Sequence, residues 1–260
     1  MPYTFAHLGY IIPLKKKFQS YFSVLGLVFG SIVPDYDILF RFTENRFHLF
    51  QYDLHSVFVI ILPLALVSTL YFDIFCKKIF IEYLPDFYYQ KYKNHQQPFI
   101  HNLTILNVIK TSISIIIAIY IHLVLDFFCH LLDGFTVKIL ILTITQNIFL
   151  SELGYIVAIY LLPIVFTIFG FYLIYKSYLK GQKVKTLFQY SDKTKIRFWY
   201  LLILLTLLLS FVKLYFINTS SFFLIDYLLI SITSSFIISC YFLCTTYNIL
   251  FYLKYKNKNA

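Results

Sequence analysis

Charged residues are scarce in this 260-residue chain, which has 22 lysines and arginines and 12 aspartates and glutamates. They make up 13% of the sequence, and hydrophobic residues make up 60%. A soluble domain has about 25% charged and about 45–50% apolar residues. So little charge cannot cover the surface of a globule, and the mean hydropathy is +0.75. The shortage of charge excludes a soluble enzyme and predicts an integral membrane protein.

Cysteine is also rare, and no Cys-x-x-Cys pair occurs. Cys76, Cys129, Cys240 and Cys244 lie inside apolar runs or at their ends. We interpret them as small buried side chains rather than as disulfides or metal ligands. No glycine-rich phosphate loop and no nucleophile elbow of serine hydrolases is present. No basic residue precedes the apolar run within residues 1–14, so we expect no cleavable signal peptide.

Long apolar segments account for most of the chain. A membrane-spanning helix needs about 20 mostly apolar residues, and six segments meet or approach this length. They are Phe18–Val33, Leu54–Phe75, Ile109–Leu132, Leu153–Tyr175, Phe198–Ile217 and Phe222–Leu253. A shorter apolar stretch, Ile139–Leu150, is typical of an interfacial or re-entrant segment. The prediction is an all-α, polytopic membrane bundle of about five or six transmembrane helices.

The positive charges are confined to alternate connectors. Eighteen of the 22 basic residues lie in Lys15–Lys17, in residues 76–110 and 176–197, and in the tail after residue 253. Basic connectors mark the cytoplasmic side of a membrane. The net charge of +10 is therefore interpreted as a determinant of topology, not as a nucleic-acid surface. We expect both termini in the cytoplasm, and two regions: a membrane domain over residues 1–165, including the basic cytoplasmic loop 76–110, and residues 166–260 with a basic loop and two final spans.

Three ionisable residues recur at intervals of four in the third span: His122, Asp126 and His130. Steps of four on an α-helix keep side chains on one face. Ionisable groups within a span are costly and usually mark a site or pathway. Imidazole and carboxylate groups bind zinc or manganese well, so the stripe predicts a divalent metal site. The alternative is a buried polar network that pairs helices.

Other candidates lie near span ends. Asp35 follows the first span in the sequence Pro34-Asp-Tyr-Asp37, where paired carboxylates can ligate a metal or act as a general base. His55, at the start of the second span, is expected to converge on Asp35 and His130. His7 can join them only if residues 4–31 form a short hairpin instead of one crossing.

These residues occur in a recognisable order. The chain opens Met-Pro-Tyr-Thr-Phe-Ala-His7 and continues with Gly26-Leu-Val-Phe-Gly30-Ser-Ile-Val-Pro-Asp35, with His55-Ser56 and with the His122 stripe. Over about residues 1–165 it resembles an uncharacterised family of bacterial polytopic membrane proteins, itself similar to inner-membrane metal-dependent hydrolases. The resemblance implies a location in the bacterial cytoplasmic membrane. It also implies a metal set that consists of His7, Asp35, His55, His122, Asp126 and His130.

One departure from that family concerns the segment before the fourth span. A Gln-His pair is expected there, but this chain has Ser151-Glu152, so Glu152 would have to replace a histidine ligand. The resemblance therefore leaves catalytic competence open, and whether the protein is an enzyme is not decided by the sequence.

Three functions remain compatible with the sequence. The first is a hydrolase that uses zinc or manganese, with Asp35 and Asp126 as catalytic carboxylates, acting on an ester or phosphoester of a membrane lipid near the outer face. The second is an ion or proton-coupled transporter, although Ile113–Ile121 is almost wholly apolar. The third is an accessory membrane protein with a vestigial site.

Overall fold

The computed structural model describes residues 4–17, 21–40, 54–84, 89, 104–131, 134–157, 162–179, 192–216 and 224–259. Every secondary-structure element within these ranges is a helix, which confirms the predicted all-α fold. Among the described residues, four helices have the length and hydropathy required to cross a membrane: Val57–Glu82, Ile105–Phe127, Lys193–Phe216 and Tyr227–Leu253.

The segments predicted as the first and fourth spans, Phe18–Val33 and Leu153–Tyr175, overlap the shorter apolar helices Val24–Tyr36 and Pro163–Lys176. The third span agrees closely, because α7 (Ile105–Leu131) carries the whole stretch from His122 to His130. Composition therefore located the apolar segments correctly.

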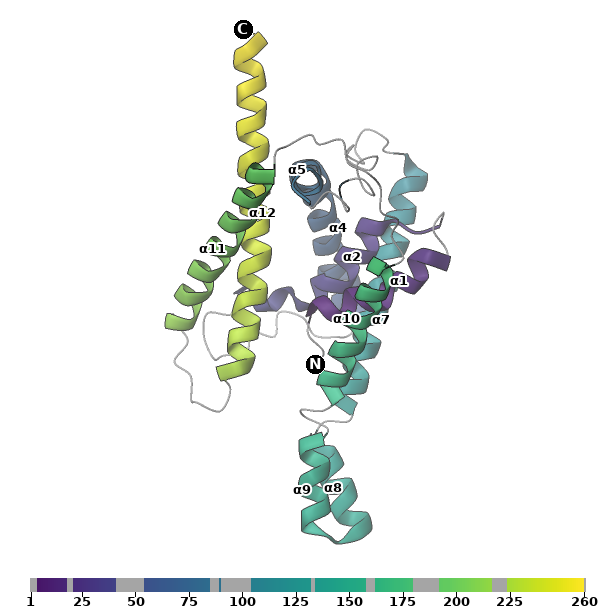
Figure 1. Ribbon diagram of the computed structural model, residues 1–260. Coiled ribbons are helices and arrows are strands. Elements are labelled where there is room, and N and C mark those ends of the chain that lie inside the picture. Colours follow the sequence, from purple (N-terminus) through teal and green to yellow (C-terminus); the bar gives the residue numbers. More distant parts are fainter. Residues whose placement is uncertain are drawn as a thin grey trace. The chain divides into compact units, whose positions relative to one another are not determined.

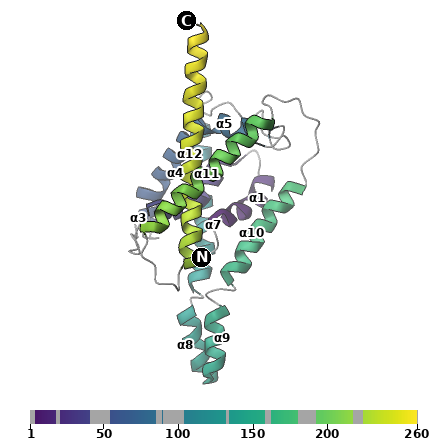
Figure 2. The same cartoon turned by 60° about the vertical axis from the view of Figure 1, so that its left-hand side comes forward.

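The chain divides into two compact units. The first comprises Met1–Asp35, Tyr52–Leu66 and Ile109–Lys180, and the second comprises Tyr36–Gln51, Val67–Val108 and Gly181–Ala260. The first unit holds the short helices α1 (His7–Lys17) and α2 (Val24–Ile32), most of α7, and α10 (Leu162–Leu179). Figures 1 and 2 show α1 close to both α7 and α10.

The N-terminal segment is a helical hairpin rather than one crossing. Helices α1 and α2 contact each other and are separate elements on either side of the turn at Tyr21. Ser23 starts α2 as its N-cap, since its hydroxyl accepts a hydrogen bond from the Gly26 amide at 3.3 Å. Pro34 lies in the first turn of the 3-10 helix η2 (Val33–Phe40), where a missing amide hydrogen is tolerated. This hairpin is the condition under which His7 can join the other candidates.

Glycines allow unusually close helix contacts in the first unit. A Cβ atom at Gly26 would lie 2.8 Å from the Thr111 carbonyl oxygen, and one at Gly30 would clash with the Ile115 carbonyl oxygen. The backbone of α2 therefore lies directly against α7, as small residues four apart permit in membrane helices. A bond from the Ser23 amide to the Ser114 hydroxyl (2.8 Å) adds to this contact.

A second close contact joins α1 to α10. A Cβ atom at Gly9 would clash with the Gly170 backbone, and one at Gly170 would clash with the Ala6 carbonyl oxygen. The Tyr10 hydroxyl donates to the Phe166 carbonyl oxygen at 2.7 Å. These two contacts hold α1 and α10 together.

The helices α8 (Gly134–Thr145) and α9 (Ile148–Ile156) form another hairpin in the first unit. Gln146 turns the chain with a positive φ of 52°, and Asn147 caps α9 by accepting from the Leu150 amide at 3.2 Å. The hairpin covers the stretch predicted to be interfacial or re-entrant, and that placement stays a prediction.

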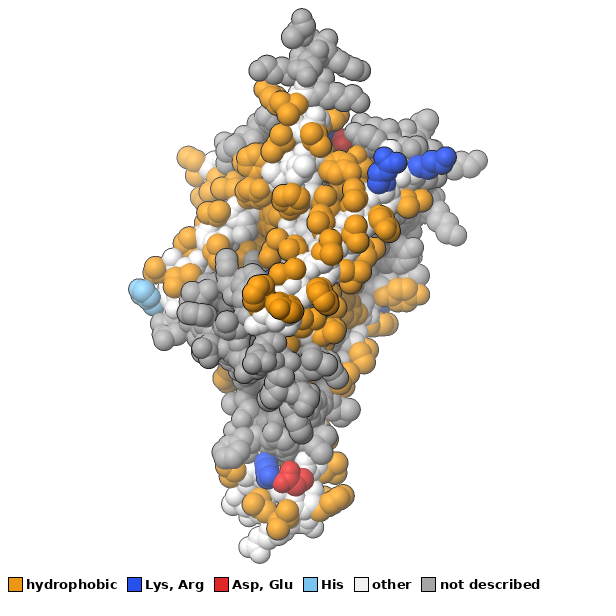
Figure 3. Space-filling model, turned by 90° about the vertical axis from the view of Figure 1, so that its left-hand side faces the viewer, with side chains coloured by type: hydrophobic (Ala, Val, Ile, Leu, Met, Phe, Trp, Pro, Cys, Tyr) orange, Lys and Arg blue, Asp and Glu red, His pale blue; other side chains and the backbone are white. Residues whose placement is uncertain are grey.

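In the second unit, α11 (Asp192–Phe216) and α12 (Leu224–Asn259) run side by side (Figures 1 and 2). The Lys213 ammonium donates to the Ser234 hydroxyl at 2.7 Å, and Ser231 donates to the Ser210 carbonyl at 3.1 Å. Hydrophobic side chains predominate on the face drawn in Figure 3. On α11, Phe211 is 72% exposed and Leu207 is 57% exposed, as expected for helices that face lipid.

The second predicted span is a continuous helix with two π-helical turns. It runs through α3 (Leu54–Ser56), η3 (Val57–Ile61), α4 (Leu62–Tyr71), η4 (Phe72–Cys76) and α5 (Lys77–Glu82). Pro63 lies two residues after the end of η3, and its ring cannot accommodate a regular α-helical carbonyl four residues earlier. The turn η4 has no proline, and such turns are frequent at functional sites.

Candidate metal centre

His122 and Asp126 form the centre of a buried polar group in the first unit. Both side chains project from one face of α7, as their spacing predicts, and they are 0% and 3% exposed. The His122 Nε2 atom lies 3.3 Å from Asp126 Oδ2. The third residue of the stripe, His130, lies on the same helix, but its side chain is outside the described residues.

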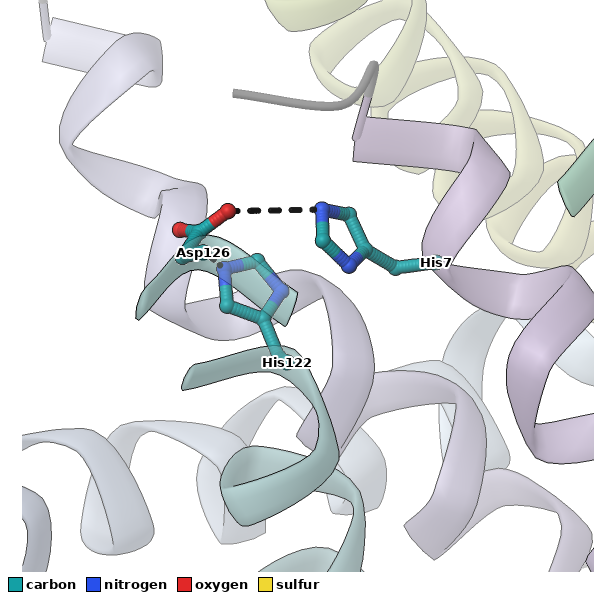
Figure 4. Close-up of side chains that lie close together, drawn as sticks. All are labelled: His7, His122 and Asp126. Atoms are coloured by element: carbon teal, nitrogen blue, oxygen red, sulfur yellow. Dashed lines mark ion pairs between the residues drawn. The ribbon is translucent and has the colours of Figure 1, made fainter. Parts of the chain in front are cut away.

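His7 reaches this group from the start of α1. Its Nε2 atom lies 3.8 Å from Asp126 Oδ1, and its ring stacks on His122 with centroids 4.1 Å apart. Figure 4 shows the His7 ring and the Asp126 carboxylate facing each other from different helices. Suitable atoms of His7, His122 and Asp126 all lie within 4.8 Å of one another. The N-terminal hairpin thus brings together residues more than 100 positions apart.

Asp35 approaches His122 from η2. Its Oδ1 atom lies 3.5 Å from His122 Nε2, and the carboxylate is almost fully buried. The Thr4 hydroxyl is within hydrogen-bonding reach of this carboxylate. His122 Nε2 therefore faces two carboxylates, one from its own helix and one from the end of the α2 segment.

A backbone carbonyl fixes the orientation of the His122 ring. The Nδ1 atom lies 2.8 Å from the Ser31 carbonyl oxygen. A carbonyl oxygen can only accept, so Nδ1 carries the hydrogen and Nε2 points to the carboxylates. Metal-ligating histidines are commonly oriented in this way, with the second nitrogen donating to a carbonyl or carboxylate.

The donor atoms fit a divalent metal ion. His7 Nδ1 and Nε2, His122 Nε2 and both Asp126 oxygens are buried without a hydrogen-bond partner among the described residues. The contacts that His122 Nε2, His7 Nε2 and the Asp126 oxygens do make are ion-pair contacts of 3.3–3.8 Å inside the group. In a tetrahedral site with bonds of about 2.0–2.2 Å, neighbouring ligand atoms lie about 3.3–3.6 Å apart. The separations of 3.3 Å and 3.5 Å around His122 match this geometry, and the 3.8 Å separation at His7 is close to it.

Two candidates do not lie in this group. The His55 side chain is exposed at the start of its helix, so the structure does not bring it to Asp35 as expected. Glu152, considered as a substitute ligand, is exposed on α9 and forms an ion pair with Lys138. The side chain of Asp37 lies outside the described residues.

Sequence reasoning missed the groups that support the site. The Ser31 carbonyl is a backbone acceptor and has no signature in the sequence. Thr4 precedes His7 by one helical turn, a spacing that could have identified it as a neighbour. The spacing of Gly26 and Gly30 is a readable signal for close helix packing, and it explains why Ser31 lies against α7.

Comparisons with known proteins identify only the family. No curated protein and no solved structure gives a significant match. Residues 1–251 match a family described as a domain of unknown function, DUF4184. The match continues well past residue 165 and includes the two C-terminal spans, which were expected to lie outside the resemblance. The chain therefore belongs to the DUF4184 family of proteins of unknown function.

Proposed function

We propose that this membrane protein is a metal-dependent hydrolase of an ester or phosphoester bond. Its divalent ion, zinc or manganese, would be held by His7, His122 and Asp126, with Asp35 beside them. The proposal rests on a cluster of buried nitrogen and oxygen atoms that could bind a metal and that have no hydrogen-bond partner among the described residues.

The charge of the group supports a divalent ion over a self-sufficient polar network. Asp35 and Asp126 together carry two negative charges when ionised, and one charged imidazole would balance only one of them. Two charged imidazoles would repel each other, because the His7 and His122 rings stack at 4.1 Å. One divalent ion balances both carboxylates with both imidazoles neutral, which lowers the cost of burying charge in an apolar surrounding.

Each residue of the site would have a separate role in the reaction. The Ser31 carbonyl holds the His122 ring so that Nε2 faces the site, and Asp126 presents its two oxygens toward the two imidazoles. Asp35 would accept the proton of the attacking water at a carboxylate oxygen, and Thr4 orients this carboxylate. The bound ion would polarise the ester oxygen and make the water more acidic.

A lipid is the proposed substrate class because the site lies in an apolar part of the chain. Asp126 lies five residues before the end of α7 (Ile105–Leu131), so the site would be nearer to one end of this span than to its middle. Ester and phosphodiester groups of lipids occupy this depth. A proton or ion relay across the membrane has less support. Ser114 lies nearer to the start of α7 than His122, and its hydroxyl already donates to the Lys110 carbonyl oxygen at 2.7 Å.

The test is hydrolysis by the purified full-length protein in detergent. Chromogenic carboxylic and phosphodiester substrates, followed by short-chain phospholipids, would be assayed after chelation and after addition of zinc or manganese. We expect metal-dependent turnover that His122→Ala and Asp126→Asn abolish and that Glu152→Gln, on the exposed face of α9, retains. Turnover that survives chelation, or that both site variants retain, would contradict the proposal; ion flux in liposomes that depends on His122 would replace it with the transporter.

A further inference from the structure

The hairpin of α8 (Gly134–Thr145) and α9 (Ile148–Ile156) exposes apolar side chains on more than one side of each helix. Figures 1 and 2 show the two helices next to each other. These exposed side chains are Ile139, Leu140, Leu142 and Ile144 on α8, and Ile148, Phe149, Leu150 and Leu153 on α9. Successive residues of an α-helix are about 100° apart, so the exposed apolar positions cover more than half of the circumference of each helix. A helix that packs one face on a core has a narrower apolar stripe.

Charged and hydroxyl groups of the hairpin have partners inside it. Lys138 and Glu152, the charged residues of the sequence 134–156, form an ion pair between the two helices. Three hydroxyls donate to carbonyl oxygens of their own helix at 2.7–2.8 Å: Thr143 to Ile139, Thr145 to Ile141, and Ser151 to Ile148. The hairpin therefore has no net charge, and these hydroxyls need no hydrogen bonds from water.

The turn between the helices also satisfies backbone groups locally. The Gln146 amide donates to the Leu142 carbonyl oxygen at 2.8 Å. The Asn147 side-chain oxygen accepts from the Leu150 amide at 3.2 Å. Lipid chains offer no hydrogen-bonding partner, so backbone groups inside a bilayer must be bonded to the protein itself. A turn with these bonds is compatible with an apolar surrounding.

We propose that the α8–α9 hairpin is a membrane-interaction surface that lies within one leaflet of the bilayer and does not cross it. Its helices of 12 and 9 residues are about 18 Å and 14 Å long, whereas the hydrocarbon core is about 30 Å thick. A protein partner or a second copy of the chain would cover one side of the hairpin, while acyl chains can surround both helices. The ion pair and the amides at the turn favour a position near the lipid headgroups over the bilayer centre.

This surface follows the helix of the candidate metal centre along the chain. Helix α8 begins three residues after α7 (Ile105–Leu131) ends. A hairpin held in one leaflet would therefore keep this end of α7, which carries His122 and Asp126, on the same side of the bilayer. The inference does not depend on the proposed hydrolase activity, because it uses none of the residues of that site.

The experiment uses tryptophan fluorescence, since the chain has a single tryptophan, Trp199. Phe149→Trp, made in the Trp199→Phe background, places the probe where the native side chain is 74% exposed. The full-length protein is reconstituted in phosphatidylcholine vesicles with bromine atoms on the acyl chains, and iodide serves as the quencher in water. We expect brominated lipid to remove most of the emission, more so with bromine near the headgroup than near the chain end, and iodide to remove little. Phe211→Trp is the matched control that should also respond to brominated lipid, because Phe211 lies in a candidate span and is 72% exposed.

Three results would overturn the proposal. Quenching by iodide but not by brominated lipid would place the hairpin in water, and quenching by neither would show that protein covers it. Stronger quenching by bromine near the chain end would place the hairpin at the bilayer centre. Leu140→Trp on α8 repeats the measurement if Phe149→Trp does not fold. His122→Ala added to either variant should leave the quenching unchanged, so failure of the proposed reaction is distinguishable from failure of this inference.

Discussion

The candidate metal site depends on the orientation of the His122 ring. One nitrogen is committed to the Ser31 carbonyl, and the other faces Asp35 and Asp126 at 3.5 Å and 3.3 Å. Without a cation, two carboxylates share one imidazole in a buried place, where like charges repel strongly. Removing one carboxylate should therefore have opposite effects on the metal-free and the metal-loaded protein.

The variant Asp126→Asn tests whether removal of a carboxylate affects the stability of the metal-free and the metal-loaded protein in opposite directions. In chelator, the amide removes a repelling charge, so the variant should be as stable as the wild type or more stable. With a divalent ion at 100 times its dissociation constant, the wild type should gain about 2.7 kcal/mol, and the variant should gain much less. Thermal unfolding in detergent, with and without metal, measures both quantities. If neither zinc nor manganese made the wild type more stable than it is in chelator, the expectation would be contradicted.

The variant Thr4→Val tests whether the Thr4 hydroxyl orients the Asp35 carboxylate. Valine matches the shape of threonine but lacks the hydroxyl that lies within bonding reach of the carboxylate. Because Asp35 is the proposed general base, loss of a partner that orients it should lower turnover about 10–100-fold, as measured with the chromogenic substrates. Thr143→Val is the control, since its hydroxyl donates within α8, to the Ile139 carbonyl oxygen. An equal loss in both variants would show that Thr4 has no specific role.

At the scale of elements, the glycine contact between α2 and α7 sets the position of the site. Gly30 directly precedes Ser31, whose carbonyl bonds to His122. A methyl group at Gly30 would meet backbone atoms of Ile115 and the Cβ atom of Ala118, and the contact is tighter than the one at Gly26. A shift of α2 away from α7 would therefore move the Ser31 carbonyl away from the ring.

Gly30→Ala should lower the free energy of unfolding by about 1–3 kcal/mol, as overpacking does, and should weaken metal binding. Gly26→Ala should have a smaller effect on both, because its nearest contacts are at 2.8 Å and 2.9 Å. Denaturation in detergent and metal titration give the two values. Equal stability of the two variants and the wild type would mean that α2 and α7 do not pack this closely.

The elements also show what the sequence allows one to predict. His122 and Asp126 were predicted because both lie on one helix, where spacing determines the face. Their contact with His7 was not decidable, because it depends on whether residues 4–31 turn back, and both arrangements satisfy the same hydropathy pattern. His55 was expected at the site from its place at a span end, but that position does not say which way a side chain points. Backbone groups such as the Ser31 carbonyl are common to every residue, so no pattern predicts them.

At the scale of the whole molecule, the apolar helices establish a membrane protein, and the orientation stays a prediction. Basic connectors at residues 76–110 and 176–197 favour the cytoplasmic side. Fusions of a phosphatase reporter, active only outside the cytoplasm, should be inactive after residue 91, after residue 185 and at the C-terminus. Fusions of a fluorescent reporter at the same places should be bright. Active phosphatase at the C-terminus would reverse the expected topology.

The metal content of the purified protein tests the central claim most directly. Elemental analysis of the full chain would be run on the wild type beside His122→Ala, Asp126→Asn and Cys244→Ala, each first confirmed to be folded. We expect about one zinc or manganese ion per chain in the wild type and in Cys244→Ala, and almost none in the two site variants. No divalent metal in the wild type after exposure to zinc and manganese, or equal content in all four proteins, would contradict it.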